Sequence, residues 1–144
     1  MHDHEPLQLE HFLPYRLSIL SNTISGDIAR EYQQQFFLSM TEWRAMAILA
    51  RFPDSSAREV AERGAMDKVA VSRAVSRLVG AGRVSRDTHD DDRRRSVLNL
   101  TPAGWKIHDV VAPLARQHER DVVGKLTDEE LATLMGILDK LSPV

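Results

Sequence analysis

The sequence contains no cysteine, which excludes disulfide bonds, a cysteine nucleophile and redox sensing by thiols. It also lacks long hydrophobic runs, since no segment approaches the roughly 18 uninterrupted apolar residues that a membrane-spanning helix needs. Residues 1–6 are polar and do not show the charged and then apolar order of a signal peptide. These absences predict a cytoplasmic protein that makes no contact with a membrane.

Features that point to enzyme chemistry are equally scarce. The seven glycines form neither a phosphate-binding loop nor a dinucleotide-binding pattern. None of the six histidines lies four residues from another, the spacing of a helical metal-binding pair. No candidate nucleophile has a base beside it in the sequence. We therefore expect no cofactor, no bound metal and no catalytic activity.

The composition is that of an ordinary globular protein, but its charge is distributed unevenly. The 144 residues are enough for a single domain with a real core, and 42% of them are hydrophobic. The net charge is −2, yet residues 58–95 hold ten basic against seven acidic residues, a local balance of +3, which leaves −5 for the remainder. Such an asymmetry would orient the molecule on a polyanion.

Apolar spacing and capping residues predict mostly helices. Residues 12–37 carry apolar side chains three and four positions apart, which is typical of a long amphipathic helix. Three further helices are predicted to begin at pairs that can form capping boxes, and a fourth at a threonine followed by proline. These starts are Ser39 with Glu42, Ser56 with Glu59, Thr127 with Glu130, and Thr101 with Pro102.

A helix-turn-helix is predicted in the middle of the chain. The short helix that begins at Ser56 stops at Arg63-Gly64, and after a turn of three to four residues that contains this glycine a second helix covers residues 67–82. The buried stripe of this second helix is formed by Val71, Ala74, Val75 and Leu78. The polar residues outside it are Lys68, Ser72, Arg73, Ser76 and Arg77, which suit base edges and phosphates. The alternative is a solvated helix face.

A charged hairpin follows the second helix. Residues 84–87 and 96–100 alternate in part between apolar and polar side chains, as strands do, and a polar run joins them. Arg93, Arg94 and Arg95 at the tip would repel one another unless a polyanion neutralised them, and arginine is favoured in narrow minor grooves. Asp92 and its two preceding aspartates can pair with these arginines, although they would serve a simple polar turn equally well.

These residues together resemble a known family. Asp92-Arg93-Arg94, followed by Leu100-Thr101 and Gly104, with Leu78, Gly82 and Arg86 upstream, is similar to the MarR family of winged helix-turn-helix transcriptional regulators. The resemblance implies a mainly α fold with a small β-hairpin wing. Residues 40–101 would form the winged helix-turn-helix module of this single domain (residues 1–144), and residues 8–37 and 102–144 would be N- and C-terminal dimerisation helices.

The resemblance also implies a homodimer on a palindromic operator in double-stranded DNA, with a recognition helix in the major groove and a wing arginine in the minor groove. By position, Ser72 and Arg73 match residues that contact bases or nearby phosphates. Arg94 matches the wing arginine, and Asp92 matches its supporting carboxylate. Apart from the resemblance, the apolar stripes of the terminal helices exceed what a winged module of some sixty residues can cover, although packing within the chain is the alternative.

Members of the family commonly bind small aromatic or phenolic anions between the dimer helices and the winged module. The candidate ligand-binding residues here are Tyr15, Arg16, Ser21, Asn22, Trp43, Arg44 and His108. Each has a plainer alternative, such as a core position for Trp43, a dimer salt bridge for Arg16 and an interface position for His108. Residues 13–17 are similar to the opening of regulators of aromatic-acid catabolism, including those that answer hydroxycinnamoyl thioesters of coenzyme A.

The sequence thus predicts a repressor that is released from DNA by a small aromatic acid or its CoA thioester. The rival class is a winged helix that serves as a protein-interaction module and has no specific operator.

Overall fold

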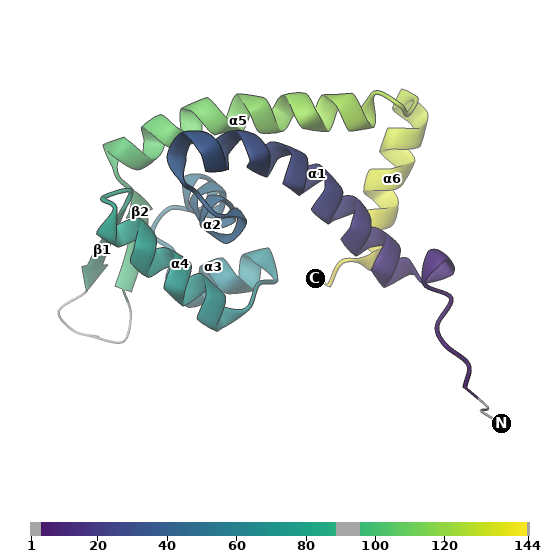
Figure 1. Cartoon of the computed structure of the whole chain (residues 1–144), viewed down its shortest axis with the longest axis horizontal. Coiled ribbons are helices and arrows are strands. Elements are labelled where there is room, and N and C mark those ends of the chain that lie inside the picture. Colours follow the sequence, from purple (N-terminus) through teal and green to yellow (C-terminus); the bar gives the residue numbers. More distant parts are fainter. Residues whose placement is uncertain (1–3, 89–95, 144) are drawn as a thin grey trace.

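The computed structural model describes residues 4–88 and 96–143. They form a winged helix-turn-helix from which long helices extend to one side (Figure 1). In chain order the elements are η1 (Leu9–His11), α1 (Leu13–Phe36), α2 (Met40–Arg51), α3 (Ala57–Gly64), α4 (Lys68–Gly80), β1 (Val84–Thr88), β2 (Ser96–Leu100), α5 (Pro102–Val123) and α6 (Asp128–Leu141). None of the helices in the described ranges is long and apolar enough to cross a membrane.

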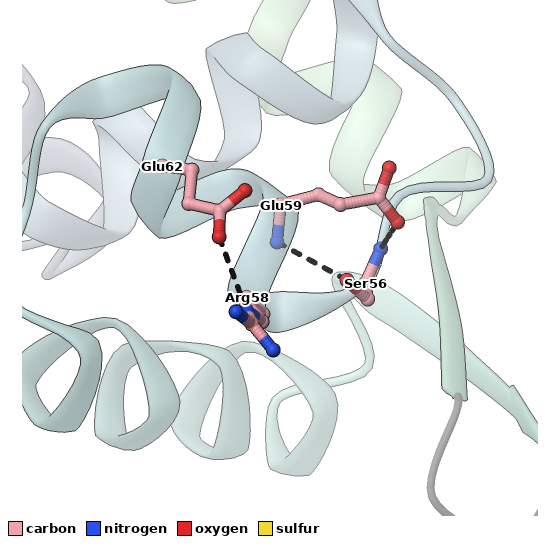
Figure 2. Close-up of polar contacts among 4 residues, drawn as sticks. All are labelled: Ser56, Arg58, Glu59 and Glu62. Atoms are coloured by element: carbon pink, nitrogen blue, oxygen red, sulfur yellow. Dashed lines mark hydrogen bonds and ion pairs between the residues drawn. The ribbon is translucent and has the colours of Figure 1, made fainter.

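Side-chain caps fix where the helices begin, as the sequence predicted. At α3 the Ser56 Oγ accepts from the Glu59 backbone N–H at 3.1 Å, and the Glu59 carboxylate accepts from the Ser56 N–H at 3.1 Å (Figure 2). Thr127 and Glu130 form the same reciprocal pair at α6. Each box satisfies two N–H groups that the helix itself leaves without a partner, so it stabilises the start of the helix.

The capping box predicted for α2 is only half formed. The Ser39 Oγ accepts from the Glu42 N–H at 3.1 Å, so Ser39 is the cap. The Glu42 carboxylate does not turn back to the helix start; it accepts from the Arg77 Nε of α4 at 3.3 Å. Glu42 faces α4 and its side chain is only 10% exposed, so a guanidinium there is a better partner than a backbone N–H.

The turn of the helix-turn-helix also differs in detail from the prediction. Gly64 is the last residue of α3, and Ala65 rather than the glycine adopts the left-handed conformation, with φ of 49°. A Cβ on Gly64 would lie 2.6 Å from the Met66 Cε and 3.0 Å from the Ile48 Cδ1. A side chain at position 64 would therefore meet the ends of the Met66 and Ile48 side chains, while the left-handed backbone of the turn lies at Ala65.

The core lies inside the winged helix-turn-helix. Its fully buried side chains include Leu38, Met46, Leu49, Val71, Val75, Leu78 and Leu98. Among the long helices, α1 adds Ala29 and Tyr32 to this core and α5 adds Ile107 and Val111, whereas α6 has no buried residue. Leu13, Leu17 and Leu20 of α1 and Leu134, Met135, Ile137, Leu138 and Leu141 of α6 are exposed. The apolar stripes of these two helices are thus left uncovered within the described part of the chain.

The wing is an antiparallel pair in which Val84 lies opposite Leu100 and Thr88 opposite Ser96. The α2–α3 loop adds to its edge through a bridge between Ser55 and Leu98. The Asp54 N–H donates to the Asn99 Oδ1 at 2.9 Å, and the Asn99 Nδ2 donates to the Asp54 Oδ1 at 2.8 Å. The base of the wing is therefore held by the helix-turn-helix on one side.

Arg83 joins the winged helix-turn-helix to the long helices. Its Nη2 donates to the Phe36 carbonyl at the end of α1 at 2.8 Å, and its own carbonyl accepts from the Thr101 N–H at 3.1 Å. Gly104, in the first turn of α5, lies so close that a Cβ there would overlap the Arg83 carbonyl oxygen. The end of α1, the start of β1 and the start of α5 therefore meet at one point.

We predict that Gly104→Ala destabilises the protein by about 1–3 kcal/mol, since the added methyl group meets backbone that cannot move without disturbing this junction. Gly80→Ala is the matched control, because nothing lies within 4 Å of its Cβ position and alanine is the better helix former. Urea denaturation at one fixed protein concentration measures both variants. Equal midpoints for Gly104→Ala and the unchanged protein would show that the junction tolerates the methyl group.

Candidate nucleic-acid interface

Helix α4 divides cleanly into a buried and an exposed side. Val71, Ala74, Val75 and Leu78 are fully buried, so the stripe predicted from the sequence is confirmed. The five polar residues predicted to lie outside that stripe are all exposed: Lys68, Ser72, Arg73, Ser76 and Arg77. We call these five residues the exposed α4 face. The helix presents two hydroxyl groups and three cations to its surroundings.

Local contacts fix the position of α4 in the module. The Asp67 carboxylate accepts from the Ala70 N–H at 2.8 Å and caps the start. At the other end the chain turns at Gly82, with φ of 75°, where the Gly82 N–H donates to the Val79 carbonyl at 3.0 Å. Helices α2 and α3 pack against the buried side of α4 (Figure 1). The exposed α4 face is thus carried by a helix that is secured at both ends and along one side.

The cations of the exposed α4 face are not equivalent. Arg77 pairs with Glu42, although its own side chain remains 58% exposed. In residues 4–88 and 96–143, Lys68 and Arg73 form no ion pair. These two residues lie in the first half of α4, the part of a recognition helix that contacts base edges in helix-turn-helix proteins. They are therefore the stronger candidates for an anionic partner.

The β1–β2 hairpin lies beside α4, as a wing does (Figure 1). The sequence placed Asp92, Arg93, Arg94 and Arg95 at its tip. All four lie outside the described residues, so their roles remain predictions. Arg86 lies on β1, where it is exposed and paired opposite Leu98 of β2.

Two of the predicted ligand residues meet in an aromatic cluster formed by Tyr32, Trp43, Trp105 and His108. The Trp43 and His108 ring centroids are 5.9 Å apart, Tyr32 lies 6.0 Å from Trp43, and Trp105 lies 5.2 Å from His108. The cluster joins α1, α2 and α5. Tyr32 was missed by the sequence analysis, although it continues the apolar spacing of Ile24 and Ile28 along α1.

Burial strengthens the hold of the Tyr32 hydroxyl on its proton. It raises the pKa of Tyr32 to about 12, against the opposing effect of the nearby Arg44 charge. The hydroxyl, like that of an ordinary tyrosine, is neutral at physiological pH, and it can donate a hydrogen bond. The Arg44 Nη2 donates to the Ser25 Oγ of α1 at 3.2 Å, so this guanidinium lies between α1 and α2.

The other predicted ligand residues lie elsewhere on α1. Tyr15 and Arg16 line an open groove of about 660 Å³ together with Leu17, Ile19 and Leu20. Ser21 and Asn22 are exposed on the same helix. Ten residues separate Tyr15 from Ser25, the α1 contact of Arg44, which is about 15 Å along a helix. Tyr15 and Arg16 thus lie apart from Arg44 within one protomer, and one small ligand does not reach from the groove to that guanidinium.

A metal site is not formed by the described residues. Within residues 4–88 and 96–143, no group of three histidine, aspartate or glutamate side chains comes close enough to hold an ion. His108 instead lies with its Nδ1 3.2 Å from the Asp109 carboxylate, and His118 lies 3.7 Å from Glu31.

Comparisons with known proteins agree with this architecture. The sequence model of the MarR family matches residues 38–95. A protein of Thauera aromatica named for regulation of the hcr operon is 29% identical over 96 residues, which are 67% of this chain and 58% of that relative. The matched segment therefore spans less than two thirds of the relative's length.

Solved structures match over nearly the whole chain. A MarR/EmrR family transcriptional regulator from Acinetobacter sp. ADP1 has a TM-score of 0.84 at 27% identity, covering 94% of this chain and 95% of that one. A mutant MarR from E. coli, solved with operator DNA, has a TM-score of 0.78 at 24% identity and covers 96% of this chain and 100% of that one. The hairpin motif, the winged fold and these likenesses agree: residues 38–95 match the MarR family of transcriptional regulators, and the chain shares the fold of that family's solved structures.

Proposed function

We propose that this regulator is a homodimer that binds a palindromic operator in double-stranded DNA through α4 and the wing. The observation that carries the proposal is the exposed α4 face, where Lys68 and Arg73 have no ionic partner in the described residues. In this proposal residues 40–101 bind DNA, and residues 8–37 and 102–144 form the dimer. A protein that binds chromosomal DNA in this way works in the cytoplasm.

The chemistry of the exposed α4 face suits the major groove. An arginine can donate two hydrogen bonds to the O6 and N7 of guanine, and this pair of acceptors distinguishes guanine from the other bases. Ser72 and Ser76 can donate to or accept from base edges or phosphates, and Lys68 can pair with a phosphate. Arg94 would enter the adjacent minor groove, where a narrow groove strengthens the negative potential.

The uncovered apolar stripes of α1 and α6 support the dimer. Leucine, isoleucine and methionine side chains that no part of the described protomer covers are stabilised when a second copy buries them. Two-fold symmetry then places the two α4 helices about 34–36 Å apart, one turn of DNA. The matching target is an inverted repeat. The operator complex of the E. coli MarR mutant, which shares this fold, is consistent with such a target.

We predict that Arg73→Ala and Arg94→Ala each weaken specific binding by about 1–3 kcal/mol, the value of a good contact to a base, without unfolding the dimer. Fluorescence anisotropy with the chain's own upstream DNA, over a salt series and against unrelated duplex, measures both. Arg58→Ala is the matched control, because Arg58 is exposed on α3 and already pairs with Glu62 at 3.0 Å (Figure 2). It should leave the affinity nearly unchanged.

Binding that is weak, sensitive to salt and equal for unrelated duplex would contradict an operator. If Arg73→Ala also had no effect, the winged helix would be a protein-interaction module, the rival function. If Arg94→Ala alone had no effect at matched salt, the wing would not engage the minor groove.

We further propose that a small aromatic acid, or its CoA thioester, releases the repressor from DNA. The aromatic cluster supports this proposal, because it offers rings for stacking, the neutral Tyr32 hydroxyl as a donor and the Arg44 guanidinium for a carboxylate. Since the cluster joins α1, α2 and α5, a ligand there would favour a dimer in which the spacing of the two α4 helices no longer matches the operator.

Titrating candidate aromatic acids and thioesters into a preformed operator complex tests the release. An active compound should lose at least about tenfold in potency with Arg44→Ala, since a charged hydrogen bond contributes roughly 1.5–3 kcal/mol. Tyr15→Ala is the control for the candidates in the α1 groove. Release that depends on Tyr15 and not on Arg44 would place the ligand in the α1 groove, and no release by any compound would remove the effector proposal.

A further inference from the structure

Val69 is an unusual residue on α4. Its side chain is 58% exposed, and among the described residues of the winged module, 40–88 and 96–101, it is the one large hydrophobic residue that is exposed. The other exposed large hydrophobic residues lie before residue 38 or after residue 104, in and around the long helices. An exposed apolar side chain in the middle of a polar face would be stabilised by an apolar contact with a binding partner.

The position of Val69 places it within the exposed α4 face. Val69, Ser72, Arg73 and Ser76 follow the spacing i, i+3, i+4 and i+7, so they form one stripe along the helix. Lys68 precedes Val69 directly. The valine is therefore bordered by the same two cations that lack ionic partners in the described part of the chain.

Neither stability nor helix formation accounts for a valine here. Its side chain is not part of the core that holds α4, which consists of residues on the opposite side. Valine is also a weaker helix former than alanine, lysine or glutamine, because its branched Cβ restricts the side chain in a helix. Single exposed apolar residues are common on protein surfaces. The position of this one on a face suited to a polyanion suggests a contact with the bases.

We infer that Val69 recognises the 5-methyl group of a thymine in the operator. The inference rests on the proposed function, in which α4 enters the major groove. In that groove the thymine methyl is the one apolar group that a base pair presents, whereas cytosine offers an amino donor at its edge. The two methyl groups of Val69 form an apolar surface that can pack against the thymine methyl. The side chain has no polar atom that could form a hydrogen bond with the edge of another base.

The spacing along α4 also gives the position of this thymine. Side chains one helical turn apart, such as Val69 and Arg73, are separated by about 5–6 Å, and successive bases along a strand by about 3.4 Å. The thymine therefore lies one or two base pairs from the base that Arg73 contacts. The pair of residues reads a guanine and a nearby thymine as one unit.

Replacing thymines of the operator by deoxyuridine, one symmetry-related pair at a time, tests the inference because this change removes only the methyl group. Replacement of the thymine pair that Val69 contacts should lower the affinity by about fourfold per half-site. This factor corresponds to the loss of one buried methyl group. With Val69→Ala the same replacement should have no effect. Alanine at this exposed helical position should not reduce stability, which a thermal melt checks.

Ser76→Ala is the matched control, since it changes another residue of the same stripe and should keep the full effect of deoxyuridine. Two results would overturn the inference while leaving the operator intact. Either no thymine replacement lowers the affinity, or the replacement costs the same with Val69→Ala as without it. Failure to bind any duplex specifically is a separate result, because it removes the proposed function and the inference with it.

Discussion

The packing of α4 against α2 is the interaction on which the rest of the structure depends. Ala74, Val75 and Leu78 of α4 are fully buried, as are Ala45 and Met46 of α2. Because an apolar stripe can be buried in only one rotational setting of a helix, this packing determines which side chains α4 presents outward. The Glu42–Arg77 ion pair crosses the same two helices and reinforces that setting. A rotation of α4 by one residue would expose the stripe and bury Arg73.

The exposed α4 face is also connected to the long helices through the packed module. The end of α1, the start of β1 and the start of α5 meet around Arg83. The aromatic cluster is a second junction, which joins α1, α2 and α5. Through these contacts, a change in the angle between α1 and α5 would displace the module that carries α4. In a dimer held by the long helices, such a change would alter the distance between the two α4 helices. Binding to an operator depends on this distance, because it must match the spacing of the two half-sites.

Much of the fold could be predicted because its signals are local. Two helix starts were predicted from capping pairs, Ser56 with Glu59 and Thr127 with Glu130. The buried side of α4 was predicted from the spacing of Val71, Ala74, Val75 and Leu78. Predictions failed or fell short where distant residues decide. Arg77 of α4 draws the Glu42 carboxylate away from the start of α2, and no local pattern indicates this contact.

The candidate site shows the same division between local and distant information. The exposed α4 face follows from helical periodicity alone, whereas the ligand residues depend on which turn of α1 lies against α2. The sequence grouped Tyr15 and Arg16 with Trp43, but the contact of Arg44 with Ser25 places Trp43 beside a later part of α1. Tyr32, which occupies that part, could be identified only once the helices were packed.

In the proposed function, a symmetric pair of α4 helices binds a specific duplex sequence. Selection of bound sequences from a random duplex library by the purified protein tests it most directly, because it assumes nothing about the genes nearby. We expect the bound sequences to converge on an inverted repeat whose half-sites are centred about one helical turn apart, roughly 10–10.5 base pairs. A bound pool without any enriched sequence, or a single unrepeated half-site, would contradict it.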